Sequence, residues 1–147
     1  MIFGIGLDLA KCSRFEKWVK DPKMLERFFN PKEFFESRNG SAPASAEGPA
    51  VPQKQAALSA ACQHYAARFA AKEAFSKALG TGLAFDLRDI YVQKEQSGKP
   101  NLVLENSALE ALKKACPSWQ SAKIFVSLTH EKEYAAAQVI IEISTCF

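Results

Sequence analysis

The hydrophobic pattern at the start of the chain is typical of a strand. Residues 2–9 are almost wholly apolar, apart from two glycines and Asp8, and such a run indicates a strand that is buried on both faces. Beyond it, aromatic and aliphatic residues recur at helical spacing, which predicts helices over 11–20 and 23–37. Asn30-Pro31 interrupts the second of these, with Asn30 placed to cap the segment that begins at Pro31.

One long helical pattern dominates the middle of the chain. From about residue 54 to Leu79 the sequence is rich in alanine, the strongest helix former, and Gly80-Thr81-Gly82 ends the helix. Strands and one more helix are predicted after it, over 88–95, 100–104, 106–115 (the helix), 124–129 and 134–141. Because helices and hairpins are mixed without strict βαβ alternation, the fold class is α+β.

The length of the chain indicates one domain over residues 1–147. Residues 41–52 contain three prolines and no aromatic side chain, so we expect a loop or partly disordered insert there. Neither flank is large enough to form a second core, which makes the segment an insertion within one domain.

Composition and charge exclude several classes of function. Nineteen Lys and Arg against sixteen Asp and Glu leave a net charge of only +3, too little to indicate a nucleic-acid partner, although a local basic cluster could still bind an anion. No stretch is apolar enough to predict a membrane span, and Asp8 interrupts the only N-terminal apolar run, so no signal peptide is expected. The four cysteines show no CxxC spacing, which indicates reduced thiols in a cytoplasmic protein: Cys12, Cys62, Cys116 and Cys146.

Asp8 is an unusual residue for an apolar strand. An ionised carboxylate there is costly unless a cation, a metal or hydrogen-bond donors compensate it. The alternative is that Asp8 simply marks the end of the strand. Gly4 and Gly6 would allow another backbone or a ligand to come close. They do not form a dinucleotide fingerprint, because Leu9 occupies the position of the third glycine.

The long helix carries two charged pairs at a spacing of four residues. Glu73 and Lys77 share one face, and Arg68 and Lys72 form a basic pair. The alternative is that both are ordinary solvated pairs. The many alanines of this segment leave the helix slim, so that other elements or a ligand could approach its backbone closely.

His130 follows the predicted strand 124–129 directly, where it could donate a hydrogen bond to a phosphate; the alternative is a turn histidine without a task. His64 is interpreted as structural or solvated, with no function. Carboxylates from separate elements, Asp8 and Glu73, suit a hard cation such as Mg²⁺, and Arg68, Lys77 and His130 would suit a polyphosphate. No GxxxxGK[ST] loop is present, which excludes an ordinary P-loop NTPase.

Three blocks of the sequence, 4–9, 68–82 and 126–131, resemble the holo-(acyl-carrier-protein) synthases, the small bacterial type of 4′-phosphopantetheinyl transferase. The helix motif from Arg68 to Gly82 is the most specific of the three, and the other two stand in the matching order. The similarity covers nearly everything except residues about 39–60, which are longer and richer in Pro and Ala than is usual in the family.

The resemblance implies a fold and a reaction. The fold would be a small antiparallel sheet packed against a long helix and shorter helices. The enzyme would move 4′-phosphopantetheine from coenzyme A to a serine of apo-acyl carrier protein, with Mg²⁺, for fatty acid biosynthesis, and release adenosine 3′,5′-bisphosphate. It would act as a homotrimer with active sites in clefts between subunits. The alternative is a non-catalytic module of the same fold that binds an acidic protein or a nucleotide, which retention of Asp8, Glu73 and Lys77 disfavours.

The resemblance also implies a role for individual residues. Asp8 and Glu73 match the metal carboxylates, and Glu73 could take the serine proton directly or through a metal-bound water. Lys77 matches a catalytic lysine near the phosphates. Three positions match the coenzyme A site, with His130 near the 3′-phosphate: Arg68, Thr129 and His130. Arg14 and Arg27 match the basic surface that docks the acidic carrier.

Overall fold

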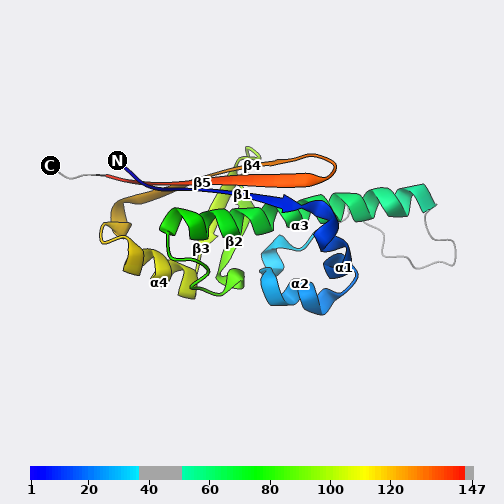
Figure 1. The fold of residues 1–147 in the computed structure, drawn as a ribbon, viewed down its shortest axis with the longest axis horizontal. Coiled ribbons are helices and arrows are strands. Elements are labelled where there is room, and N and C mark those ends of the chain that lie inside the picture. Colours follow the sequence, from blue (N-terminus) through cyan, green and yellow to red (C-terminus); the bar gives the residue numbers. More distant parts are fainter. Residues whose placement is uncertain (37–50, 145–147) are drawn as a thin grey trace.

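One long helix, α3 (Val51–Leu79), lies along one face of a three-stranded antiparallel sheet (Figure 1). The computed structural model describes residues 1–36 and 51–144. The strand order of the sheet is β1-β5-β4, so the first and last strands of the chain pair with each other, and the bounds are β1 (Ile2–Lys11), β4 (Ala122–His130) and β5 (Tyr134–Ile143). The sheet therefore has two free edges, one formed by β1 and the other by β4.

The short helices lie on the side of α3 away from the sheet, whereas the hairpin between them in sequence passes α3 and reaches the level of the sheet (Figure 1). A two-stranded hairpin turns at Gly98, which has a positive φ of 84°. Its strands are β2 (Ile90–Lys94) and β3 (Pro100–Leu104), and the helices are α1 (Glu16–Val19), α2 (Pro22–Phe28) and α4 (Asn106–Ala115). Short 3₁₀ turns join them: η1 (Cys12–Phe15), η2 (Pro31–Glu33), η3 (Leu87–Asp89) and η4 (Trp119–Ser121). Among the described residues, no helix is long and apolar enough to cross a membrane.

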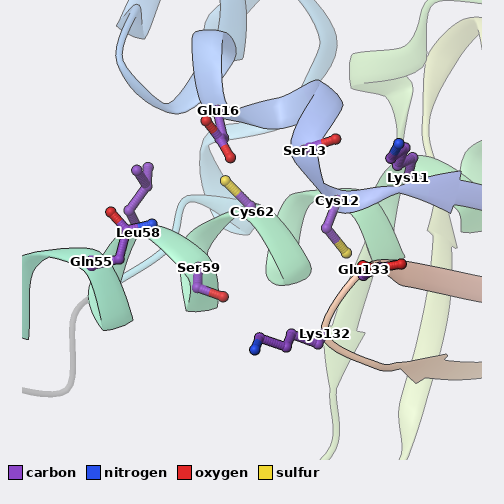
Figure 2. Close-up of a pocket in the computed structure, with 10 residues that line it drawn as sticks. All are labelled: Lys11, Cys12, Ser13, Glu16, Gln55, Leu58, Ser59, Cys62, Lys132 and Glu133. Carbon is purple, nitrogen blue, oxygen red and sulfur yellow. The ribbon is translucent and has the colours of Figure 1, made fainter. Parts of the chain in front are cut away.

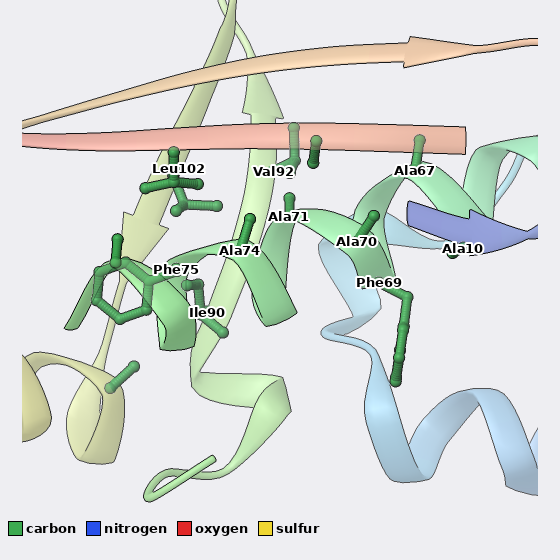
Figure 3. Packing of buried hydrophobic residues seen from close by; sticks show 14 of the residues in the cluster. Ala10, Ala67, Phe69, Ala70, Ala71, Ala74, Phe75, Ile90, Val92 and Leu102 are labelled. Carbon is green, nitrogen blue, oxygen red and sulfur yellow. The ribbon is translucent and has the colours of Figure 1, made fainter. Parts of the chain in front are cut away.

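The alanines of α3 and the glycines of β1 allow the two backbones to touch. A Cβ atom on Gly6 would overlap the carbonyl oxygen of Ala74, and one on Gly4 would overlap that of Ala78. Buried alanines, among them Ala70 and Ala74, form the face of α3 that meets the sheet (Figure 3). The expectation that the helix is slim enough for close approach is confirmed, and the approaching element is a strand.

Aromatic rings hold the N-terminal helices against the opposite face of α3. The Trp18 ring stacks on Phe28 at 4.7 Å between centroids and meets Phe69 of α3 edge-on at 5.6 Å. Phe15 and Phe29 are fully buried beside them. Edge-on and offset aromatic pairs of this kind add to the stabilisation that burial alone provides.

The α+β class is confirmed, and α4 coincides with the predicted helix over 106–115. The predicted helices over 11–20 and 23–37 are wrong in extent, because each breaks into short pieces at a proline or a 3₁₀ turn. Asn30 does cap η2, with its side chain accepting from the amide of Lys32. The loop expected over 41–52 ends by Val51, where α3 begins, slightly before the predicted start of the helix near residue 54. Residues 37–50 lie outside the described residues, and the insert over about 39–60 stays a prediction.

The prediction that β1 is buried on both faces is also wrong for the single chain. Its inner face packs on α3, but Ile5, Leu7 and Leu9 on the outer face are 54%, 62% and 64% exposed. The reason is that helices cover only one side of this sheet (Figure 1). A strand with apolar residues on both faces and cover on only one leaves a large apolar surface, and such a surface is typical of an interaction site.

Candidate active site

Lys77 compensates the Asp8 carboxylate. Its Nζ donates to Asp8 Oδ1 at 2.9 Å and to the carbonyl oxygen of Leu7 at 3.0 Å. The Asp8 side chain is only 17% exposed, so the ammonium group offsets part of the cost of removing that charge from water. The close approach of β1 to α3 at Gly6 brings the strand and the helix near enough for this contact.

Glu73 adds a second carboxylate on the same face of α3, one turn before Lys77. Partial burial raises the pKa of Glu73, and the charge of Asp8 raises it further, whereas Lys77 and Arg14 lower it. The two carboxylates therefore repel each other across the β1–α3 contact. A cation placed between them would relieve that repulsion, and a carboxylate pair completed by water and phosphate oxygens is a donor set that Mg²⁺ accepts.

Two carboxylates are the whole acidic set at this place. Within residues 1–36 and 51–144, no group of three or more His, Cys, Asp or Glu side chains is arranged to hold a metal ion. A closed zinc-type site, which needs such a group, is therefore not present in the described part of the chain.

A cavity of about 910 Å³ lies on the other side of α3, beside the β4 edge of the sheet. Arg68, His130 and Lys94 line it together with the hairpin residues Gly98 and Pro100. Its volume is within the range of pockets that hold small molecules. The predicted residues Arg68 and His130 are thus brought together. Thr129 is not, because consecutive strand residues point to opposite faces and its side chain is exposed on the other side of β4.

The structure separates the predicted residues into two groups. Asp8, Glu73 and Lys77 lie at the β1 edge, and none of them lines the cavity at the β4 edge. Arg68 and Lys77 are nine positions apart, about two and a half helical turns, so they project from opposite sides of α3. Within one chain, a single ligand of modest size could not contact both groups directly.

The Arg68 guanidinium has a free hydrogen-bond donor, among the described residues, with which it could bind an anion. Burial lowers its pKa, though an arginine remains charged at neutral pH. Its Nη1 donates to the carbonyl oxygen of His64 at 3.3 Å, while its buried Nε has no partner among the described residues. Buried donors are normally satisfied, so an anionic group in the cavity would supply what this nitrogen lacks.

His64, interpreted from the sequence as structural or solvated, also belongs to the lining of this cavity. Its Nε2 lies 2.6 Å from the carbonyl oxygen of Glu33, and burial, followed by the charge of Arg68, lowers its pKa to about 4. The one sequence signal for it is its position four residues before Arg68, which places both on one helix face. The hydrogen bond to Glu33 is compatible with the interpretation of His64 as structural.

Arg14 and Arg27, predicted to dock an acidic partner, are both exposed near the aromatic cluster. The Arg14 guanidinium lies 5.5 Å from the ring centroid of Phe69, and that of Arg27 lies 5.4 Å from Phe28. Rings at this distance hold a guanidinium in place without neutralising it. Because Arg14 also affects the pKa of Glu73, the basic surface borders the carboxylate pair.

A second cavity, of about 350 Å³, lies between the end of β1 and the N-terminal half of α3 (Figure 2). It contains Cys12 and Cys62 and none of the predicted site residues. Burial raises the pKa of both thiols, which keeps them protonated and unreactive. Together with Cys116 they are free cysteines, as expected; Cys146 lies outside the described residues.

Comparison with known proteins assigns this arrangement to a family. The family model of the 4′-phosphopantetheinyl transferase superfamily matches residues 4–139, which include both groups of residues. The chain belongs to this superfamily. The resemblance drawn from the three sequence blocks is thereby confirmed.

Individual relatives agree over the whole chain. A holo-(acyl-carrier-protein) synthase of Treponema denticola is 47% identical over 146 residues, covering 97% of this chain and 99% of its own length. A crystal structure of such a synthase from Bacillus anthracis, in complex with CoA (3′,5′-ADP), is 32% identical with a TM-score of 0.65, and the match covers 98% and 99% of the two chains. An acyl carrier protein synthase of Plasmodium yoelii with ADP bound is 28% identical with a TM-score of 0.68, covering 99% and 98%.

Proposed function

We propose that the chain transfers the 4′-phosphopantetheine group of coenzyme A to a serine of apo-acyl carrier protein, as a step that serves fatty acid biosynthesis. The proposal rests on one observation. A cavity lined by Arg68 and Lys94 lies on one side of α3, and the Asp8–Lys77 pair lies on the other. A phosphoryl transfer needs both, because its catalysis rests on holding phosphates in place and offsetting their charge.

Asp8 and Glu73 would hold the Mg²⁺ ion. The mutual repulsion that raises the pKa of Glu73 supports this role, because a divalent cation favours both carboxylates in their ionised form. When bound, the ion supplies positive charge to the phosphate oxygens. Lys77, already 2.9 Å from Asp8, would contribute a further cation on the same side of α3.

The reaction forms a bond between the serine oxygen of the carrier and the phosphorus that bears pantetheine, and it breaks the bond from that phosphorus to adenosine 3′,5′-bisphosphate. Glu73 would accept the serine proton, directly or through a water. Arg68, Lys94 and His130 would bind the phosphates of the nucleotide in the cavity.

The chain would act as a homotrimer in the cytoplasm. The outer face of the sheet carries apolar side chains on all three strands, with Ile5 aligned to Ile140 and Ile140 aligned to Phe125. Packing copies through this face would bury side chains that are exposed in the single chain. It could also bring the β1 edge of one copy beside the β4 edge of the next, which would unite the two groups of site residues. The three free thiols support a reducing compartment.

Arg14 and Arg27 would dock the acidic carrier. Exposed charges of this kind mainly set the rate and specificity of encounter, and the position of Arg14 near Glu73 would direct the carrier serine toward the carboxylates.

The test is incubation of the full chain with apo-acyl carrier protein and coenzyme A, followed by intact-mass measurement of the carrier. We expect the phosphopantetheine adduct with Mg²⁺ present and its loss when a chelator removes the metal. An unmodified carrier, under conditions in which a known transferase modifies it, would contradict the proposal. Full modification in the presence of the chelator would contradict only the proposed requirement for Mg²⁺, not the transferase activity.

A further inference from the structure

The cavity at the β4 edge contains one group that does not fit a purely phosphate-binding site. Arg68, Lys94 and His130 can each bind an anion, but His64, also in the lining, is held in a neutral form. His64 lies beside Arg68 in the lining, so it can contact the same ligand. A neutral imidazole can accept a hydrogen bond, which a guanidinium or an ammonium group cannot do.

The hydrogen bond to Glu33 fixes the tautomer of His64. A carbonyl oxygen only accepts, so the contact of 2.6 Å requires that Nε2 carries the proton. Neutral imidazole has one protonated nitrogen, which leaves a lone pair on Nδ1. Among the described residues, Nδ1 has no hydrogen-bond partner, and His64 belongs to the lining of the cavity.

Part of the lining beside His64 is apolar, although Glu36, Gln63 and Arg68 also belong to it. The ring of Phe35 meets it edge-on, with 5.1 Å between centroids. Ala60, Ala67 and Pro100 also line the cavity and add only methyl groups and a ring. A lone pair in such a lining would repel a phosphate oxygen, but it would accept from a planar group that carries an N–H donor.

We propose that His64 is a specificity-determining residue that accepts, at Nδ1, a hydrogen bond from the exocyclic amine of the adenine base of the nucleotide. The inference rests on the proposed function, because it takes coenzyme A as the ligand. Arg68, Lys94 and His130 bind the phosphates of that ligand, and the apolar wall beside Phe35 and Pro100 takes the base. Hypoxanthine carries a carbonyl oxygen in place of the amine, so two lone pairs would face each other.

Direct binding tests this without turnover. In calorimetric titrations, the wild-type chain should bind adenosine 3′,5′-bisphosphate about tenfold more tightly than inosine 3′,5′-bisphosphate. The adenine amine gains a hydrogen bond to Nδ1, whereas the hypoxanthine carbonyl would be repelled by the same lone pair. His64→Phe keeps an aromatic ring against Phe35 and should reduce the preference to about twofold or less. Gln63→Ala, which changes a neighbouring lining residue, should keep it.

Equal affinities for the two nucleotides in the wild-type chain would overturn the inference, as would a preference that persists in His64→Phe. Failure of both nucleotides to bind would contradict the proposed function instead. If His64→Phe does not fold, nitrogen NMR of the histidine rings in the wild-type chain provides a second test. The Nδ1 resonance of His64 should move when the adenosine nucleotide binds and stay in place with the inosine one; the reverse, or no change with either, would overturn the inference.

Steady-state kinetics with a coenzyme A whose base is modified should show whether His64 determines specificity or has only a structural role. A hydrogen bond to the base, remote from the reacting phosphorus, should raise KM for inosine coenzyme A about tenfold and leave kcat within about twofold. His64→Phe should remove that difference between the coenzymes. An equal change for both coenzymes would show a structural role only and would overturn the inference.

Discussion

Lys72 Nζ lies 2.6 Å from Glu33 Oε2, and neither side chain exposes any surface to solvent. The ammonium group also donates to the carbonyl oxygens of Leu87 and Ile90, and Glu33 Oε1 accepts from the amide of Val92. One ion pair therefore ties α3 to η2, η3 and β2. The carbonyl of the same glutamate holds His64, so this pair also positions a wall of the cavity.

Breaking this pair should destabilise the fold strongly. In Lys72→Met the Glu33 carboxylate would remain buried without its cation, which typically costs about 3–5 kcal/mol. Urea unfolding followed by circular dichroism measures the loss. The matched control is Lys113→Met, which removes an exposed pair with Glu110 at 2.7 Å and should cost less than about 0.5 kcal/mol. A loss below about 1 kcal/mol for Lys72→Met would contradict the role given to the pair.

Gly6 should not tolerate even a methyl group. In Gly6→Ala the new Cβ would overlap the carbonyl oxygen of Ala74, and backbone atoms cannot rotate away. We expect a loss of about 2–3 kcal/mol in the free energy of unfolding, together with lower transferase activity as Asp8 moves away from Lys77. Gly82→Ala serves as control, because Gly82 faces open space and its φ of 68° costs a non-glycine residue only about 1–2 kcal/mol. Equal activity in the two variants would argue against the close approach.

The sequence predicted that β1 and α3 each allow a close approach, because the signals for this are local. An acid in an apolar strand, glycines beside it and an alanine-rich helix all stand in short segments, and each has a direct physical meaning. Lys72 could not be assigned in the same way. Its partner Glu33 lies 39 residues away, and nothing in the helical pattern distinguishes a buried lysine from a solvated one.

The division of the site into two groups also depends on long-range structure. It follows from the strand order β1-β5-β4, which places Asp8 and His130 at opposite edges of the sheet. Periodicity predicts strands but not their order. The exposed outer face of β1 has the same cause, since an apolar strand is compatible with a second layer of helices or with another copy of the chain.

A charge on the outer face of the sheet should prevent assembly. Phe125 is 44% exposed in the single chain and aligned with Ile140, so in a trimer Phe125→Glu would bury an unpaired carboxylate. We expect a monomer by size-exclusion chromatography with light scattering, and loss of activity if the site forms between copies. Leu83→Glu changes a residue of similar exposure outside the sheet and should leave the assembly intact. A wild-type chain that is itself monomeric would contradict the proposed homotrimer.

Removal of the second carboxylate should abolish metal-dependent turnover. Glu73→Gln keeps the shape of a side chain that is only partly buried, so the melting temperature should change little. Turnover should fall at least a hundredfold if the residue holds the metal or takes the proton. Glu110→Gln, on the exposed face of α4, is the control and should keep the wild-type rate. Wild-type rates in Glu73→Gln would show that the carboxylate has been assigned the wrong role.

The buried state of His64 should make the fold sensitive to mild acid. Its pKa falls from an ordinary 6.5 to about 4 in the folded chain, because burial and the charge of Arg68 disfavour the protonated ring. Between these values the unfolded chain binds the extra proton, so the free energy of unfolding should fall as the pH is lowered from about 6.5 to about 4, by on the order of 3 kcal/mol in all.

The comparison that isolates this effect is His64→Gln. Its amide can still donate to the carbonyl of Glu33 but does not titrate, so the variant should lose much less stability over the same pH interval. Urea midpoints at pH 7.0, 6.0, 5.0 and 4.5 measure the difference. Because the carboxylates that titrate in this range are common to both chains, their contribution cancels in the comparison. Parallel pH profiles for the two chains would mean that His64 can take up a proton in the folded state without cost, and therefore that its imidazole is not held neutral beside Arg68.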